Sequence, residues 1–163
     1  MEKRIYLEKF TPVDFDKFYE LVSNEKVMAM ITERAIPLDE AMKTYNLSLN
    51  NNELHKSFGS FKIIENSTNK FIGSALLRVK EKNSTEAELG YMLLPSYWGK
   101  GIGSVVAELL IEKAKEEKQL NKITAIIDPN NIASRKILIK NGFTSEKVCE
   151  IDGLPGEILS MKI

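Results

Sequence analysis

The chain has 163 residues, of which 23 are basic and 23 acidic, so its formal net charge is zero. This length suits one domain over residues 1–163 and is too short for two, and the balanced charge gives no reason to expect a nucleic-acid partner. Cys149 is the single cysteine, which excludes an internal disulfide and fits a reducing compartment. No run of residues is apolar for long enough to form a membrane span or a secretory signal, so we expect a cytoplasmic protein without a membrane partner.

The first third of the chain predicts one strand and two helices. Residues 5–10 alternate loosely, as a strand does. Thr11-Pro12-Val13-Asp14 is typical of a helix start, with a Thr cap, Pro in the first turn and an early acid, and apolar residues follow at helical spacing. A second helix is predicted from residue 39 to about residue 54. Between the helices, residues 28–31 and Pro37 indicate a mobile apolar loop.

The rest of the chain predicts six strands and two helices. Strands are predicted at 57–65, 71–80 and 86–94, and the polar turn 66–70 joins the first two as a hairpin. A helix at 102–118, a strand at 122–127 and a helix at 132–141 follow, the last opened by Asn131 and ended by Gly142. Strands at 143–151 and 158–163, around a turn at 152–156, close the chain. This order predicts a mixed α/β (α+β) sheet of about seven strands with about four helices.

The segment Trp98-Gly99-Lys100-Gly101-Ile102-Gly103-Ser104 places three glycines at alternate positions between a predicted strand and a predicted helix. Glycine tolerates positive φ and lets a ligand approach the main chain closely. The start of the following helix adds unpaired N–H donors and the positive end of the helix dipole. The segment therefore predicts a binding site for a phosphate or diphosphate group.

Two common phosphate motifs do not fit this segment. A P-loop requires a Gly-Lys-Ser/Thr step, whereas Gly103-Ser104 has no intervening lysine. A dinucleotide fingerprint requires G-x-G-x-x-G near a first βαβ unit, whereas this loop has G-x-G-x-G spacing and lies well along the chain. Nucleoside triphosphatases and dinucleotide-dependent enzymes are therefore set aside.

Three segments together carry a family resemblance: residues 88–103, the run Asp128-Pro129-Asn130-Asn131-Ile132-Ala133-Ser134-Arg135, and Asn141-Gly142-Phe143. They resemble the GNAT superfamily of acyl-CoA N-acyltransferases. Within it they are similar to the Rim-type branch, the ribosomal-protein N-terminal acetyltransferases and their relatives, which commonly share Trp98.

The resemblance implies that acetyl-CoA is the co-substrate and that its diphosphate binds the main-chain amides of Gly99, Lys100, Gly101, Ile102, Gly103 and Ser104. It also implies that strands 86–94 and 122–127 are a parallel pair that splays into a V-shaped cleft. Pantetheine would enter this cleft and bond to the main chain near Met92, Leu93 and Leu94. Asn131 has a sufficient explanation as a helix cap, and the resemblance adds a hydrogen bond to the pantetheine amide. Arg135 is open to two interpretations, a contact with the nucleotide phosphates or a surface position.

The resemblance implies that Ser134 donates a proton to the departing CoA thiolate, although a serine there can equally face solvent or bond to the backbone. Many members of the superfamily have a tyrosine acid four residues before the Gly of the Gly-Phe pair, where this chain has Leu138. Either Ser134 replaces that tyrosine or catalysis depends on solvent.

The base is less defined by the sequence. Glu88 lies on the strand beside the expected cleft and is the first candidate, acting directly or through water. A solvent-facing strand position explains Glu88 equally well. Glu150, Asp152 and Glu157, near the closing hairpin, are reserve candidates. His55 is the only histidine and fits a surface position, and the sequence shows no metal-ligand cluster.

The sequence thus predicts an N-acetyltransferase that moves an acetyl group from acetyl-CoA to a primary amine, and a chain that is a monomer or a homodimer. The acceptor stays open among protein or peptide N-termini and small-molecule amines. A non-catalytic acyl-CoA-binding module is the alternative, because the tyrosine is missing and the base is ambiguous.

Overall fold

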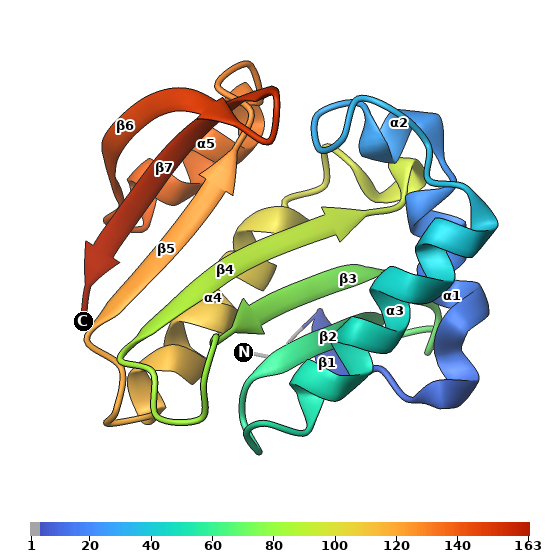
Figure 1. The fold of residues 1–163 in the computed structure, drawn as a ribbon, viewed down its shortest axis with the longest axis horizontal. Helices are drawn as coiled ribbons and strands as arrows, with labels where there is room; N and C mark the ends of the chain where they lie inside the picture. Colours follow the sequence, from blue (N-terminus) through green and yellow to red (C-terminus); the bar gives the residue numbers. More distant parts are fainter. Residues whose placement is uncertain (1–3) are drawn as a thin grey trace.

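The computed structural model describes residues 4–163, in which seven strands form one sheet: β1 (Ile5–Lys9), β2 (Gly59–Glu65), β3 (Phe71–Arg78), β4 (Glu86–Leu93), β5 (Lys122–Ile127), β6 (Thr144–Ile151) and β7 (Leu154–Lys162). The strands lie in the order β1-β2-β3-β4-β5-β7-β6 (Figure 1). Every neighbouring pair is antiparallel except β4 and β5, which are parallel. The predicted mixed, mostly antiparallel sheet is confirmed.

The described residues contain five α-helices: α1 (Phe15–Val22), α2 (Glu25–Met28), α3 (Leu38–Asn52), α4 (Ile102–Glu116) and α5 (Ile132–Lys140). Short 3₁₀ turns at Pro12–Asp14 and Pro95–Tyr97 precede α1 and follow β4. Helices α1 to α3 lie on one face of the sheet, and α4 and α5 lie on the other (Figure 1).

The structure differs most from the sequence predictions at two places. The segment expected to be a loop from residue 28 begins within α2, because the Asn24 side chain accepts hydrogen bonds from the N–H groups of Lys26 and Val27 and so starts a helical turn. The final strand begins at Leu154 instead of residue 158. Asp152 and Gly153, with φ of 51° and 81°, form a two-residue turn, so the chain re-enters the sheet four residues earlier than predicted.

Two apolar clusters fill the two sides of the sheet. The larger one packs α4, Leu138 of α5 and the strand residues that face them, including Leu89 and Leu93 of β4. The smaller one lies under α1 to α3 and includes Met92 of β4. Alternate residues of β4 therefore belong to opposite layers, as a strand buried on both faces requires.

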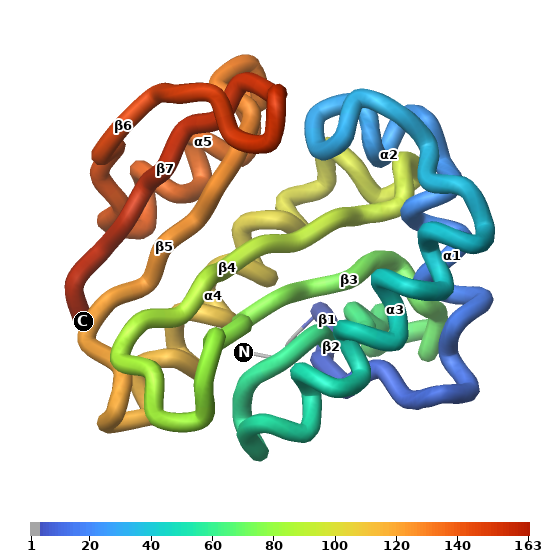
Figure 2. Tube along the Cα trace, in the orientation of Figure 1, coloured from blue at the N-terminus to red at the C-terminus, as the bar shows by residue number. Residues whose placement is uncertain are grey.

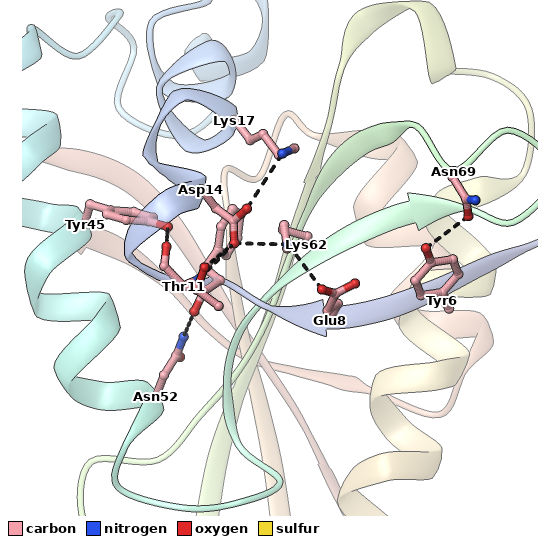
Figure 3. A network of polar contacts seen from close by, with 10 residues as sticks. Tyr6, Glu8, Thr11, Asp14, Lys17, Tyr45, Asn52, Lys62 and Asn69 are labelled. Atoms are coloured by element: carbon pink, nitrogen blue, oxygen red, sulfur yellow. Dashed lines mark hydrogen bonds and ion pairs between the residues drawn. The ribbon is translucent and has the colours of Figure 1, made fainter.

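A buried charge network anchors the α1–α3 layer to the sheet (Figure 3). The Asp14 carboxylate, 4% exposed, accepts hydrogen bonds from Thr11 and lies 3.0 Å from the Lys62 ammonium of β2. Burial alone would raise the pKa of Asp14, but the bonds from Thr11 and Lys62 outweigh burial and lower it. The residues of the predicted helix start at Thr11 thus also connect the α1–α3 layer to the sheet.

The parallel strands β4 and β5 separate soon after they pair. Their register covers only Glu86–Lys122, Ala87–Ile123 and Glu88–Thr124. Beyond these pairs, β4 continues along β3 to Leu93, and β5 continues along β7 to Ile127. The tube trace of Figure 2 shows the two strands diverging toward their carboxyl ends. The sheet is therefore split at its centre, as the predicted V-shaped gap requires.

Candidate active site

A cavity of about 550 Å³ lies where β4 and β5 separate. On the α4–α5 face, the glycine loop and the first turns of α4 and α5 line it. On the opposite face, α2 and the residues just after it line it. The cavity thus connects the two layers through the gap in the sheet.

The glycine loop exposes main-chain donors to this cavity. Gly99 and Gly101 have φ of 72° and 78°, in the left-handed region that favours glycine. Gly101 is the N-cap of α4, and no side chain of residues 4–163 caps that helix. The first three N–H groups of α4, from Ile102, Gly103 and Ser104, have no acceptor within the helix, and all three residues line the cavity.

Gly103 is needed for close packing as well. A Cβ at this position would lie 3.3 Å from both Ile137 Cδ1 and Tyr91 Cε2, which is tighter than ordinary van der Waals contact. The bare backbone therefore lets the start of α4 rest directly on β4 and α5.

Arg4 is a loop contact that the sequence analysis missed. Its Nη1 donates a hydrogen bond of 2.7 Å to the Lys100 carbonyl and lies 3.5 Å from where a Cβ on Gly101 would stand. The Lys100 side chain does not line the cavity, and its ammonium lies 5.7 Å from the centre of the Tyr97 ring. The cationic side chain that contacts the glycine loop is thus Arg4, which lies 96 residues before Lys100 in the sequence.

The edge of β4 that faces the gap can be assigned from two hydrogen bonds. The Leu94 N–H bonds to the Ile72 carbonyl at 2.9 Å, whereas the Leu93 carbonyl accepts the Trp98 indole N–H at 2.8 Å. Because main-chain groups alternate along an antiparallel ladder, Met92 faces β3, like Leu94, and Tyr91 and Leu93 face the gap. Of the three main-chain positions expected to hold pantetheine, Leu93 is on the open edge.

Asn131 and Ser134 meet at the cavity wall. The Asn131 side chain accepts the Ser134 N–H at 3.2 Å and caps α5, and both residues line the cavity. Leu138 occupies the position at which many superfamily members have a tyrosine. It is 1% exposed and lines the cavity beside Asn131 and Ser134.

Tyr91 brings a phenol to the same wall, which the sequence analysis did not single out. Its hydroxyl is buried and has no hydrogen-bond partner within residues 4–163. Burial raises the pKa of Tyr91, and the nearby Ser134 side chain lowers it by less. No sequence pattern marks this residue, because only the packing of β4 under α4 and α5 buries the hydroxyl.

None of the candidate bases lines the cavity. Glu88 accepts a hydrogen bond of 2.8 Å from Arg78. Glu150 and Asp152 are exposed in the β6–β7 hairpin. Glu157 is 2% exposed and accepts two hydrogen bonds from Arg135 Nε at 3.1 and 3.2 Å. The Arg135 Nε is thus bound to Glu157, a contact of Arg135 with the nucleotide phosphates stays a prediction, and the structure brings no carboxylate among these candidates to the cavity.

Residues 4–163 contain no group of three or more His, Cys, Asp or Glu side chains that could hold a metal ion. The sole histidine, His55, lies 4.0 Å from Glu117 and stacks on Phe58, outside the cavity. None of the helices in this part of the chain is long and apolar enough to cross a membrane.

Comparison with known proteins identifies the class that this fold and cleft define. The sequence profile of the acetyltransferase (GNAT) domain matches residues 4–144, so the chain belongs to the GNAT acetyltransferase family. The predicted superfamily is confirmed, and the Rim-type branch stays a prediction.

Two curated relatives are N-acetyltransferases by name. YnaD of Bacillus subtilis is 27% identical over 88% of this chain and 81% of its own length. The protein p20 of Bacillus licheniformis is 32% identical over 60% of this chain, and that match covers 55% of p20. Among solved structures, spermidine N-acetyltransferase from Vibrio cholerae, in complex with CoA and spermine, superposes with a TM-score of 0.81 at 18% identity, covering 99% of this chain and 96% of that one. Solved structures of this fold contain CoA or acetyl-CoA, and acetyl-CoA is the co-substrate of the family.

Proposed function

We propose that the protein transfers the acetyl group of acetyl-CoA to a primary amine by direct attack within a ternary complex. The observation that carries this proposal is the cavity itself. Unpaired amides at the start of α4 lie at one end, and an open strand edge runs along it. These features match the two chemical parts of a CoA thioester, an anionic diphosphate and a chain of amides.

The diphosphate would bind the main-chain amides at Gly99, Gly101, Ile102, Gly103 and Ser104, with Lys100 and Arg4 adding positive charge. A hydrogen bond to a charged group contributes about 1.5–3 kcal/mol, so a few of them supply much of a micromolar affinity. Pantetheine would pair with the open edge at Tyr91 and Leu93, next to Met92 and Leu94, as an added strand does. Asn131 would hold a pantetheine amide.

In the proposed reaction the neutral amine attacks the thioester carbon, a C–N bond forms and the C–S bond breaks. The Ser134 hydroxyl gives its proton to the leaving thiolate. Deprotonating the amine at pH 7 costs about 1 kcal/mol for an α-amine and about 4.6 kcal/mol for a lysine, from their reference pKa values. An α-amine therefore needs little help from a base, and a base role for Glu88, bound to Arg78 outside the cavity lining, would run through water.

Calorimetry with acetyl-CoA and a thiol-release assay with a panel of primary amines test this function. We expect acetyl-CoA to bind and CoA thiol to appear only when an amine is present. Binding without thiol release from any amine would instead establish the non-catalytic acyl-CoA-binding module. Absence of binding would contradict acetyl-CoA as the co-substrate of this protein.

The Rim-type assignment is also a proposal, supported by Trp98 in the loop and by Ser134, one helical turn before Leu138, at the cleft wall. Peptides with free and with blocked N-termini, offered in the same assay, test it. A peptide acceptor would support this branch, and activity confined to small amines would contradict it.

A further inference from the structure

The acceptor side of the cavity is apolar. This inference rests on the proposed function, since acetyl-CoA bound at the α4 side leaves the α2 side for the amine. Val27 of α2, Met30 and Ile31 just after it, and Ile126 of β5 line that side. Met30 and Ile31 are each 44% exposed, so these apolar side chains lie at the mouth of the cavity and are only partly covered by the described residues.

The charge on this wall has one sign. Among residues 4–163 that line the cavity, Lys26 is the only charged side chain, and there is no Asp or Glu. Glu20 and Glu25 line a separate, shallow hollow that also includes Lys26. An ion pair between either of these exposed glutamates and an ammonium group of the acceptor would contribute little binding energy. An acceptor with several ammonium groups would thus meet a cation and apolar surface where it needs carboxylates.

We propose that the acceptor is a single primary amine attached to an apolar group, with no further positive charge. The apolar group would pack on Met30, Ile31 and Ile126, while the amine passes between β4 and β5 to the thioester. Two sources carry this chemistry, a peptide N-terminus with an apolar first residue and a small arylalkyl amine.

Four acceptors test the proposal at saturating acetyl-CoA: phenethylamine, a free peptide beginning with Met, the same peptide with a blocked N-terminus, and spermidine. We expect kcat/KM for phenethylamine or the free peptide to exceed that for spermidine by about tenfold or more. Comparison of the first two identifies the source, and the blocked peptide shows that the amine is the acceptor group.

An Ile31→Glu variant sharpens the test. It should raise the spermidine-to-phenethylamine ratio, whereas Leu47→Glu, on an α3 side chain that is 70% exposed and outside the cavity lining, should not. A wild-type preference for spermidine, or bound acetyl-CoA with no turnover of either apolar amine, would overturn this inference. Failure to bind acetyl-CoA would overturn the proposed function, so the two failures are distinguishable.

A second observation concerns catalysis. Tyr91 Oη is the only buried side-chain nitrogen or oxygen within residues 4–163 that has no hydrogen-bond partner. A buried polar atom of this kind is costly and calls for a reason. The Tyr91 ring lies against the Gly103 backbone, and Tyr91 and Ser134 line the same cavity.

The geometry points to Tyr91 as a positioning residue for Ser134. When the thiolate forms, the phenol donates a hydrogen bond to Ser134 Oγ, which turns the serine proton toward sulfur. Tyr91 itself stays protonated, and burial favours that state. The phenol would thus support the serine on a chain that has leucine at position 138.

The Tyr91→Phe variant gives two signals of opposite direction. Because it removes a buried unpaired hydroxyl, its melting temperature without ligand should rise by a few degrees. The value of kcat should fall roughly tenfold, with KM for acetyl-CoA within about twofold. Combining it with Ser134→Ala should cause little loss beyond Ser134→Ala alone.

Tyr6→Phe is the matched control, since that hydroxyl contacts only Asn69, at 3.1 Å, outside the cavity lining. Unchanged kcat in Tyr91→Phe, unchanged kcat in Ser134→Ala, or a loss of kcat accompanied by a lower melting temperature would each overturn the positioning role.

Discussion

A substitution at position 104 should change the stability of α4 and the affinity for acetyl-CoA in opposite directions. Ser104 is the third residue of α4, whose first turn contains no acid. A carboxylate there should stabilise the helix by about 0.3–1 kcal/mol through its dipole. The same charge should repel the diphosphate, so Ser104→Glu is expected to weaken acetyl-CoA binding tenfold or more by Coulomb repulsion.

Thermal unfolding without ligand and calorimetry with acetyl-CoA measure the two effects, and Ser104→Ala is the neutral control. Gly103 would be a poorer probe, because a Cβ there already crowds Ile137 and Tyr91. Full affinity in Ser104→Glu would show that the diphosphate binds elsewhere.

Arg4 offers a test of the loop from outside the cavity. Because its guanidinium bonds to the Lys100 carbonyl beside Gly101, Arg4→Met should lower acetyl-CoA affinity by roughly three- to tenfold, less than the loss of a hydrogen bond made directly to the ligand would cause. Arg34→Met, which breaks an exposed pair with Glu40, should leave the affinity unchanged. Equal affinities in the two variants would show that Arg4 does not support the loop.

Between elements, the Asp14–Lys62 pair makes the attachment of the α1–α3 layer dependent on pH. The pKa of Asp14 is lowered on folding, so its contribution is present above its unfolded pKa of about 3.9 and is lost as pH falls through the folded value. Burial alone would lower the pKa of Lys62, but the hydrogen bonds and negative charges of Asp14 and Glu8 together outweigh burial and raise it. Its contribution is present below the ordinary lysine value and is lost as pH rises through the raised one.

The Asp14→Asn variant should therefore be destabilised by about 2 kcal/mol at neutral pH, because the buried Lys62 ammonium then keeps only the exposed Glu8, at 3.5 Å, as an ionic partner. The difference from wild type should shrink below about pH 3. Urea unfolding at the two pH values measures it, with Asp16→Asn, an exposed acid in the same helix, as control. A difference that stays constant with pH would contradict the assigned ionic role.

Local patterns in the sequence were sufficient to predict most elements, but not their ends. Alternation, caps and glycines placed every strand and the four longer helices, because those signals lie within a few residues of one another. Helix α2 is only four residues long, too short for a periodic pattern. The β6–β7 turn was predicted too long because the Asp152-Gly153 step lies among other turn-forming residues.

For the site, the sequence predicted the loop, Asn131 and Ser134, and apart from Lys100 these residues line one cavity in the structure. It could not predict Arg4 or Tyr91, because their contacts depend on which distant segments the sheet brings together. It gave no means to test Glu88, whose ion pair with Arg78 joins neighbouring strands.

At the scale of the whole molecule, bound acetyl-CoA should stabilise the fold, because it would contact both halves of the split sheet. A ligand at one hundred times its Kd stabilises the folded state by about 2.7 kcal/mol. For a domain of this size the melting temperature should then rise by about 5–10 °C. Differential scanning calorimetry measures the shift. Pantetheine at the same concentration should produce little of it, because it lacks the diphosphate, and equal shifts would contradict the assigned contacts.

The separation of β4 from β5 has a consequence for how such a protein can change over time. In the proposed complex, acetyl-CoA would be bound there chiefly by main-chain peptide groups, and every amino acid except proline supplies the same groups. Side chains on these strands could therefore change during evolution without loss of acetyl-CoA binding. Substitutions in α2 and the segment after it could meanwhile change which amine is accepted. Acceptor specificity could thus evolve while the acetyl-transfer reaction is kept.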